Sequence, residues 1–190
     1  MTIGKKLYFG FGAILMAMLI LFVINIFTVT REYSARSAAA ATLSDVQSIE
    51  DIRFEMMENR LNLGNYLLSG DIRDEDKTNH GINDLLDLIK QEEGRVSDPA
   101  LRSSLSQVEE NERGWSDNFA KQMLAKRHQV DAGDITVSDL QIFYLQHDPA
   151  SWTTKSSAVL DDANRSVRRA LDDSNASAAA ATRWSTIITT

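Results

Sequence analysis

A stretch of uncharged, mostly apolar residues at positions 7–29 is the feature that most constrains this chain. The stretch follows directly on Lys5 and Lys6. As a helix, a stretch of this length extends roughly 34 Å, which is enough to cross a hydrocarbon core of about 30 Å. We therefore predict a cytoplasmic N-terminus at residues 1–6 and a transmembrane helix at residues 7–29.

A second apolar stretch begins at the end of the chain. Trp184 follows Arg183 and suits the membrane interface, where aromatic side chains gather. Residues 184–190 are therefore expected to be the start of a second transmembrane helix. A cleaved signal peptide is the alternative for the first stretch, because small residues such as Ser34 and Ala35 follow it, but such peptides have apolar regions of only about 7–15 residues.

The basic residues before the first stretch also predict an orientation. Positive charges favour the cytoplasmic side of a membrane, although Arg31 and Arg36 weaken the bias because they flank the other end. The prediction is a protein of the bacterial inner membrane with residues 30–183 extracytoplasmic.

The composition of the chain limits its chemistry. The net charge of -7 and the lack of a basic patch argue against nucleic-acid binding. Because the 190 residues include no cysteine, disulfides, thiolate catalysis and zinc-thiolate sites are excluded. Only two prolines occur, and no run of alternating β-branched residues is present, so we predict an all-α fold.

Helix boundaries follow from the capping residues. Pro99 and Pro149 each follow an aspartate, a pair typical of the N-cap and first position of a helix. The other expected boundaries are helix ends at Gly70, Gly94 and Gly133 and an N-cap at Asp74. The helices expected after the first span cover residues 30–69, 75–94, 99–131 and 149 to the end.

Each of these four helices carries one apolar stripe at a spacing of three and four residues. The stripes consist of Val46, Ile49, Met56, Leu63 and Leu67 in the first helix, Ile82, Leu85, Leu86 and Ile89 in the second, Leu101, Leu105, Val108, Trp115 and Phe119 in the third, and Leu160, Ala163, Val167 and Ala170 in the fourth. Because each helix has a single stripe to bury, we predict an antiparallel up-down-up-down four-helix bundle that continues from the transmembrane helix.

The lengths of the helices predict a dimer. The first and fourth helices extend on the order of 50 to 60 Å, whereas the second covers only about 30 Å. The part nearest the membrane would then hold two helices, with alanines at residues 38–41 and 178–181 that permit close packing. Two helices alone bury little surface, so we expect a homodimer through the first and fourth helices.

Two arginines interrupt the stripe of the first helix. Arg53 and Arg60 are seven residues apart and should face the bundle or the dimer seam. Paired guanidiniums could bind a small anionic ligand, with further contacts from Asn59 and Asn62. The structural alternative is that acidic residues of the chain pair with them; the candidates are Glu50, Asp51, Asp161 and Asp162.

Several segments together resemble a known family. Residues 2–7, Thr-Ile-Gly-Lys-Lys-Leu, followed by Gly-Phe-Gly at 10–12, resemble the entry to the first membrane helix of bacterial methyl-accepting chemotaxis proteins. Residues 65–71, Asn-Tyr-Leu-Leu-Ser-Gly-Asp, are similar to the Arg-Gly-Tyr-Leu-Leu-Thr-Gly-Asp signature of the helical CHASE type-three sensory domain. Ser-Asp-Pro at 97–99, followed by a helix with Trp115, also fits. Gly64 and Asn65 replace the Arg-Gly of the signature.

This resemblance implies the sensory and membrane-anchor part of a transmembrane chemoreceptor that signals by helix repacking in a dimer. Its expected partners are the membrane and a small anionic ligand or a periplasmic binding protein. In this family's motif Tyr66 either contacts a ligand or, as the structural alternative, ends the helical hairpin. Alternative outputs are a histidine kinase or a cyclic-dinucleotide enzyme, and a structural membrane-anchored coiled coil is the alternative from another class.

No catalytic constellation, cofactor motif or metal motif is evident, so we do not expect an enzyme. The three histidines lack the spacing of a helical metal site. Residues 135–152 are rich in aromatic and apolar side chains, and we expect a short helix there that caps the distal core, or alternatively a ligand pocket.

Overall fold

The computed structural model describes the backbone of residues 3–188. The side chains of residues 1–14, 17, 28, 31–32, 35, 178 and 180–190 lie outside the described set. The described backbone is almost entirely helical and contains no strand, which confirms the predicted all-α class.

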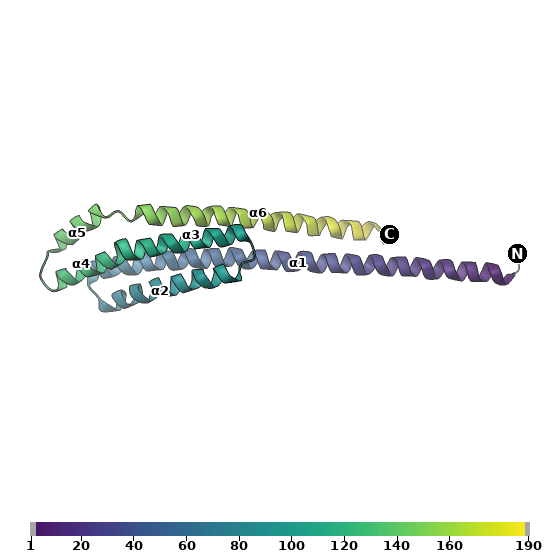
Figure 1. Ribbon diagram of the computed structural model, residues 1–190, viewed down its shortest axis with the longest axis horizontal. Helices are drawn as coiled ribbons and strands as arrows, with labels where there is room; N and C mark the ends of the chain where they lie inside the picture. The colour runs from purple at the N-terminus through teal and green to yellow at the C-terminus, as the bar shows by residue number, and fades with distance from the viewer. Residues whose placement is uncertain (1–2, 189–190) are drawn as a thin grey trace. The chain divides into compact units, whose positions relative to one another are not determined.

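The helices follow one another with short connections (Figure 1). They are α1 (Ile3–Ser69), α2 (Ile72–Arg95), α3 (Pro99–Trp115), the π-helical turn η1 (Ser116–Ala120), α4 (Lys121–Asp131), α5 (Val137–Gln146) and α6 (Ala150–Ile188). Because α3, η1 and α4 follow without a break, together they correspond to the helix predicted for residues 99–131. The wide turn η1 within it was not expected.

The predicted caps next to the prolines are confirmed. The Asp98 carboxylate accepts a hydrogen bond from the Ala100 amide at 2.9 Å, and the Asp148 carboxylate accepts one from Ala150 at 2.8 Å. Each side chain thereby satisfies an amide at the start of a helix that has no partner within the helix.

Two other boundary predictions were wrong. Asp71, not Asp74, is the N-cap of α2, because its side chain accepts from the Arg73 amide. Gly94 lies within α2, which ends one residue later. Gly70, by contrast, has a φ of +70° and ends α1 as expected, since glycine adopts this conformation without a steric cost.

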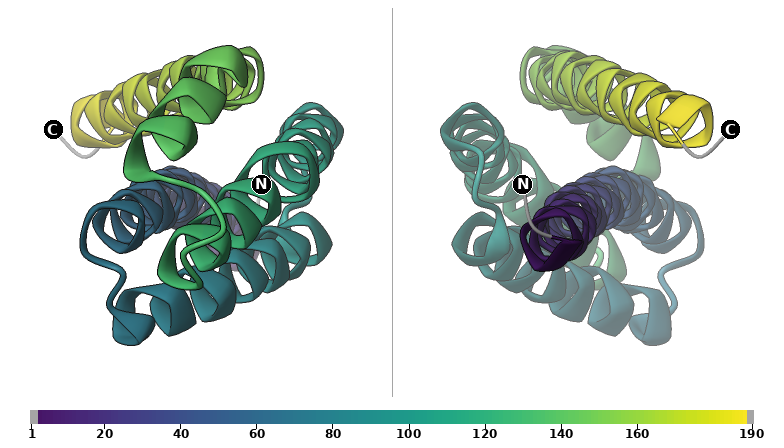
Figure 2. Two further views of the ribbon diagram at one scale, coloured as in Figure 1. Left: turned by 90° about the vertical axis from the view of Figure 1, so that its left-hand side faces the viewer. Right: turned by 90° about the vertical axis from the view of Figure 1, so that its right-hand side faces the viewer.

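The chain divides into two units, which we describe separately. One consists of Met1–Leu43 with Arg169–Thr190, and the other is Ser44–Arg168. In the Ser44–Arg168 unit, the helices run alongside one another (Figure 2). All buried apolar residues found among the described side chains belong to this unit.

The core of the Ser44–Arg168 unit consists of two clusters of buried apolar side chains. The first core cluster contains Val46, Ile49, Ile52, Met56, Leu85, Ile89, Val96, Leu101, Leu105, Val108, Leu160, Ala163 and Val167. The second core cluster contains Leu63, Tyr66, Ile82, Trp115, Phe119, Ala120, Met123, Leu124 and Leu140. The predicted apolar stripes supply most of these residues, which shows that the three-four spacing identified the buried faces.

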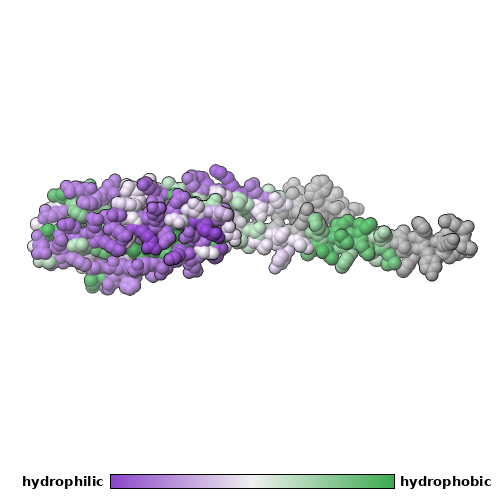
Figure 3. Space-filling view, viewed as in Figure 1, coloured by the Kyte–Doolittle hydropathy of each residue, from purple (hydrophilic) through white to green (hydrophobic). Residues whose placement is uncertain are grey.

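The unit of Met1–Leu43 with Arg169–Thr190 does not fit the prediction of a membrane protein. Its α1 segment carries exposed apolar side chains from Leu15 to Val29 (green in Figure 3). The side chains of residues 7–14 and 184–190 lie outside the described set. In the part of the chain that is described, no helix is both long and apolar enough to cross a membrane. This finding contradicts the predicted inner-membrane location with residues 30–183 extracytoplasmic.

Candidate functional site

Arg53 pairs with a carboxylate of α6. Its Nη2 donates to Asp161 Oδ1 at 2.7 Å, and its Nε lies 3.9 Å from Glu50 Oε2. Both carboxylates are among the partners that the sequence offers for this arginine. The Arg53 side chain is 40% exposed, so the ion pair is accessible to water.

Arg60 lies in a much less exposed environment. Its Nη2 donates to both carboxylate oxygens of Glu112 at 2.8 and 2.7 Å, and its Nη1 donates to the Met56 carbonyl at 2.8 Å. The guanidinium also lies 4.3 Å from the centre of the Trp115 ring, a cation–π distance. The Glu112 side chain is only 2% exposed, so its charge depends on Arg60 for compensation.

These groups belong to a polar layer between the two core clusters. The Ser156 hydroxyl on α6 donates to Glu112 Oε1 at 2.7 Å. At the same level the Asn59 side chain donates from Nδ2 to the Gly81 carbonyl of α2 at 2.8 Å. We define the polar layer as Asn59, Arg60, Glu112 and Ser156, contributed by α1, α3 and α6.

The polar layer fixes how the helices align. Asn59 and Ser156 are 1% and 0% exposed, and both make hydrogen bonds, as buried polar groups require. A slide of α6 along α3 would separate Ser156 from Glu112 and leave a buried carboxylate with one bond fewer, which is costly. The polar layer therefore favours one register of α1, α3 and α6.

Tyr66 lies in the second core cluster and is 1% exposed. Its ring meets the edge of His128 with 6.1 Å between centroids, and the Glu75 carboxylate bonds to His128 Nε2 at 2.9 Å. Burial, followed by the hydrogen bond to the Glu75 carboxylate, raises the pKa of the Tyr66 hydroxyl. Tyr66 is thus a buried core residue, and the histidine that its ring contacts bonds to Glu75 of α2.

The predicted ligand-binding residues are spread over the unit. Asn59 and Arg60 share the polar layer, whereas Arg53 faces Asp161 and Tyr66 belongs to the second core cluster. Asn62 is half-buried on α1. Because a carboxylate of this chain holds each guanidinium, an anionic ligand would have to displace Asp161 or Glu112 in order to bind there.

Two grooves lie on the surface of the Ser44–Arg168 unit. One, of about 550 Å³, lies between α3 and α6 and contains Trp152 and Lys155. The other, of about 540 Å³, is mostly apolar and lies between the end of α1 and α5. The predicted short helix in residues 135–152 is confirmed as α5, which buries Leu140 in the second core cluster.

Sequence reasoning missed Glu112 and Ser156, although a signal for both was present. Glu112 lies four residues after Val108 and three before Trp115, on the apolar stripe of its helix. Ser156 lies four residues before Leu160 in the same way. A polar residue at a stripe position is a candidate for a buried hydrogen-bonded contact.

Within the described residues, no group of histidine and acidic side chains is placed to hold a metal ion. Comparison with known proteins gives no match to a family model, to a curated protein or to a solved structure.

Proposed function

We propose that this chain is the sensory part of a receptor of the methyl-accepting chemotaxis type, and that it works as a homodimer whose helices repack on ligand binding. The resemblance at residues 65–71 supports the family. Gly70 ends α1 with a φ of +70°, and Asp71 caps α2 directly afterwards, so the motif forms a tight helical hairpin.

Within the Ser44–Arg168 unit we infer an antiparallel up-down-up-down four-helix bundle of α1, α2, α3 continued by η1 and α4, and α6. The two-residue connection between α1 and α2 and the three-residue connection between α2 and α3 support this arrangement, because short connections make neighbouring helices antiparallel. Buried side chains of all four helices contribute to the core, which supports it further.

The observation that carries the proposal is an exposed apolar stripe on α1, which the helix has in addition to the single stripe expected from the sequence. Phe54, Met57, Leu61 and Leu68 are 57%, 64%, 61% and 86% exposed. They follow one another at intervals of three, four and seven residues, the spacing of a coiled-coil seam. An exposed apolar stripe of this kind is typical of a protein interface. A second copy fits it best, because a two-fold axis brings identical stripes together.

The polar layer supports a relay within each subunit. Ser156 ties α6 to Glu112 of α3, and Arg60 ties α3 to α1. A ligand that favours a different packing of α6 would exchange these bonds for others, which gives two discrete arrangements and not a continuous drift. Both α1 and α6 continue beyond the Ser44–Arg168 unit, so each could pass such a change along its length.

Cysteine cross-linking tests the dimer. Because the chain has no cysteine, Leu61→Cys introduces a single thiol, and in a symmetric dimer it meets its own copy across the axis. We expect oxidation to give a disulfide-linked dimer in high yield. Lys90→Cys, exposed on α2, is the matched control and should remain monomeric on denaturing gels. Equal cross-linking of both variants would reject the seam.

A fusion tests the signalling role. The chain is joined to the kinase-controlling module of a characterised chemoreceptor, and kinase activity is measured. Leu61→Glu places like charges at the seam and should abolish control of the kinase. Ser156→Ala should shift the basal activity while the dimer persists. Activity that neither substitution alters would contradict the proposal.

A further inference from the structure

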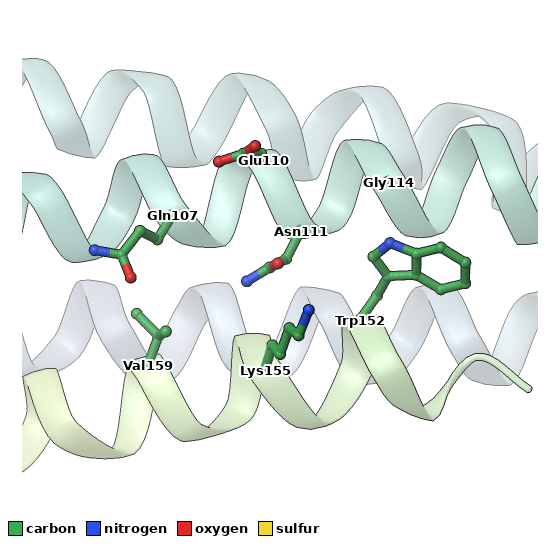
Figure 4. A pocket seen from close by; sticks show the side chains of 7 residues that line it. All are labelled: Gln107, Glu110, Asn111, Gly114, Trp152, Lys155 and Val159. Carbon is green, nitrogen blue, oxygen red and sulfur yellow. The ribbon is translucent and has the colours of Figure 1, made fainter.

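The groove between α3 and α6 combines a cation, two amides and an aromatic wall (Figure 4). Its volume of about 550 Å³ falls within the range of small-molecule sites, roughly 300 to 1,000 Å³. Gln107 and Asn111 project from α3 toward α6, and Lys155 projects from α6 toward α3. Groups from two helices thus converge on one space.

Trp152 forms a wall with a defined shape. The indole lies against α3 at Gly114, where an added Cβ would come within 2.6 Å of Trp152 Nε1. Only a residue without a side chain lets the ring approach this helix so closely. The ring is half-buried, so its remaining surface is available to a ligand in the groove.

Lys155 supplies the charge of the groove. Among the described side chains, no carboxylate lies within ion-pair distance of its ammonium group. Two acidic residues of α3 already have partners, because Glu112 binds Arg60 and Ser156 and Glu109 accepts from Arg113. Glu110 lies along the edge of α3 that points away from α6 (Figure 4). The groove therefore holds the Lys155 ammonium without an ion-pair partner, and the Glu110 carboxylate lies at its edge.

We propose that this groove binds a planar organic monocarboxylate. The carboxylate pairs with the Lys155 ammonium, and the planar part of the ligand packs on the Trp152 indole. The side-chain amides of Gln107 and Asn111 bond to polar substituents of the ligand, since each amide both donates and accepts. A single ammonium matches a single negative charge, and Glu110 at the rim disfavours a dianion.

The position of the groove links binding to the polar layer, and this step rests on the proposed function. Asn111 and Lys155 each precede a residue of the layer, Glu112 and Ser156. A ligand wedged between α3 and α6 therefore acts at the hydrogen bond that sets their register.

Isothermal titration of the full chain tests the binding. The protein is kept in a mild detergent that covers the exposed apolar side chains of residues 15–29, and the probes are benzoate and indole-3-acetate. We expect saturable binding of both probes. Benzamide, which is neutral, and phenyl phosphate, which is a dianion, should bind at least about tenfold more weakly. Equal binding of benzamide, tighter binding of phenyl phosphate or no saturable binding of the carboxylates would overturn the proposal.

Substitutions locate the site. Lys155→Gln keeps a polar side chain, one atom shorter, but removes its charge, and it should weaken carboxylate binding by about tenfold or more. Lys90→Gln makes the same change of charge on α2 and should leave affinity within about twofold of the original. Gly114→Ala should displace the indole and weaken binding while Lys155 remains. Unchanged affinity in Lys155→Gln would place the ligand elsewhere and reject the groove.

The kinase fusion separates the two proposals. If the carboxylates bind as expected but leave kinase activity unchanged, the proposed binding site is supported and the proposed sensory function is rejected. If kinase control depends on Leu61 and Ser156 but no carboxylate binds, the sensory function is supported and the proposed ligand class is rejected.

Discussion

Arg53 and Arg60 lie seven residues apart on α1, but the ion pairs that they form differ in burial. The Arg60 side chain is 22% exposed against a partner that is 2% exposed, whereas Arg53 and Asp161 are 40% and 47% exposed. Water screens an exposed pair and leaves it with little net free energy, while a buried carboxylate depends on its partner. The two pairs should therefore respond differently to the loss of one member.

We predict that Glu112→Ala lowers the free energy of unfolding by on the order of 3 kcal/mol, because it leaves the Arg60 guanidinium without its carboxylate. Asp161→Ala should cost less than about 1 kcal/mol. Urea denaturation followed by circular dichroism measures both values. The double variant Arg60→Met with Glu112→Leu should recover most of the loss, since no charge remains buried. Equal losses for the two single variants would contradict this assignment.

The cap of α2 gives a prediction about pH. Hydrogen bonds from the Arg73 guanidinium, and then from its backbone amide, lower the pKa of the Asp71 carboxyl from 3.8 to about 2. Because the pKa is depressed in the folded state, the contribution of this cap is complete above pH 3.8 and is lost as the pH falls toward about 2. We expect the Arg73 amide resonance to titrate near pH 2 in NMR spectra. Asp71→Asn should remove this transition, and a midpoint near 3.8 would refute the assigned contacts.

At the scale of the element, α2 contains two glycines in different surroundings. Gly81 lies against the polar layer, where an added Cβ would overlap Oδ1 of the buried Asn59 side chain. Gly94 has no atom within 4 Å of such a Cβ. Both lie within the helix, where alanine is intrinsically the better residue by roughly 0.5 to 1 kcal/mol. The surroundings therefore decide the sign of the substitution.

We predict that Gly94→Ala raises the free energy of unfolding by up to about 1 kcal/mol. Gly81→Ala should lower it, because Asn59 must move and its hydrogen bond to the Gly81 carbonyl is broken or strained, at a cost of about 1–3 kcal/mol. Thermal and urea unfolding of the two variants measure the difference. Stabilisation by both substitutions would show that Asn59 does not pack against α2 as described.

For the whole molecule, the buried apolar side chains are concentrated in one unit. Those found among the described residues lie between Val46 and Val167, inside the Ser44–Arg168 unit. The exposed apolar run from Leu15 to Val29 belongs to the other unit. The folding free energy of the Ser44–Arg168 unit should therefore come from its own contacts.

We predict that residues 44–168 expressed alone fold cooperatively and retain their helicity, because both core clusters and the polar layer are complete within them. The full chain in water without detergent should associate into large species through its exposed apolar side chains. Circular dichroism and sedimentation velocity check the two outcomes. Non-cooperative melting of residues 44–168 would show that the remaining residues are needed for the core.

The sequence alone determined the helical class, the caps at Asp98 and Asp148, the helix end at Gly70 and most of the buried stripes. Each of these depends on interactions within one or two helical turns, and the residue types at those positions record them. The N-cap of α2 was misplaced because Asp71 and Asp74 offer the same side chain, and only the backbone geometry distinguishes them.

Only the tertiary structure decided which groups meet across helices. Glu112 lies 52 positions from Arg60, and Ser156 lies 44 positions from Glu112. Their contact depends on the relative register of α1, α3 and α6, which local periodicity does not specify. The same reason applies to the α3–α6 groove. Gly114 and Trp152 come into contact only because α3 and α6 pack in this register. A helix pattern fixes the face that is buried, and packing fixes the partner that the face meets.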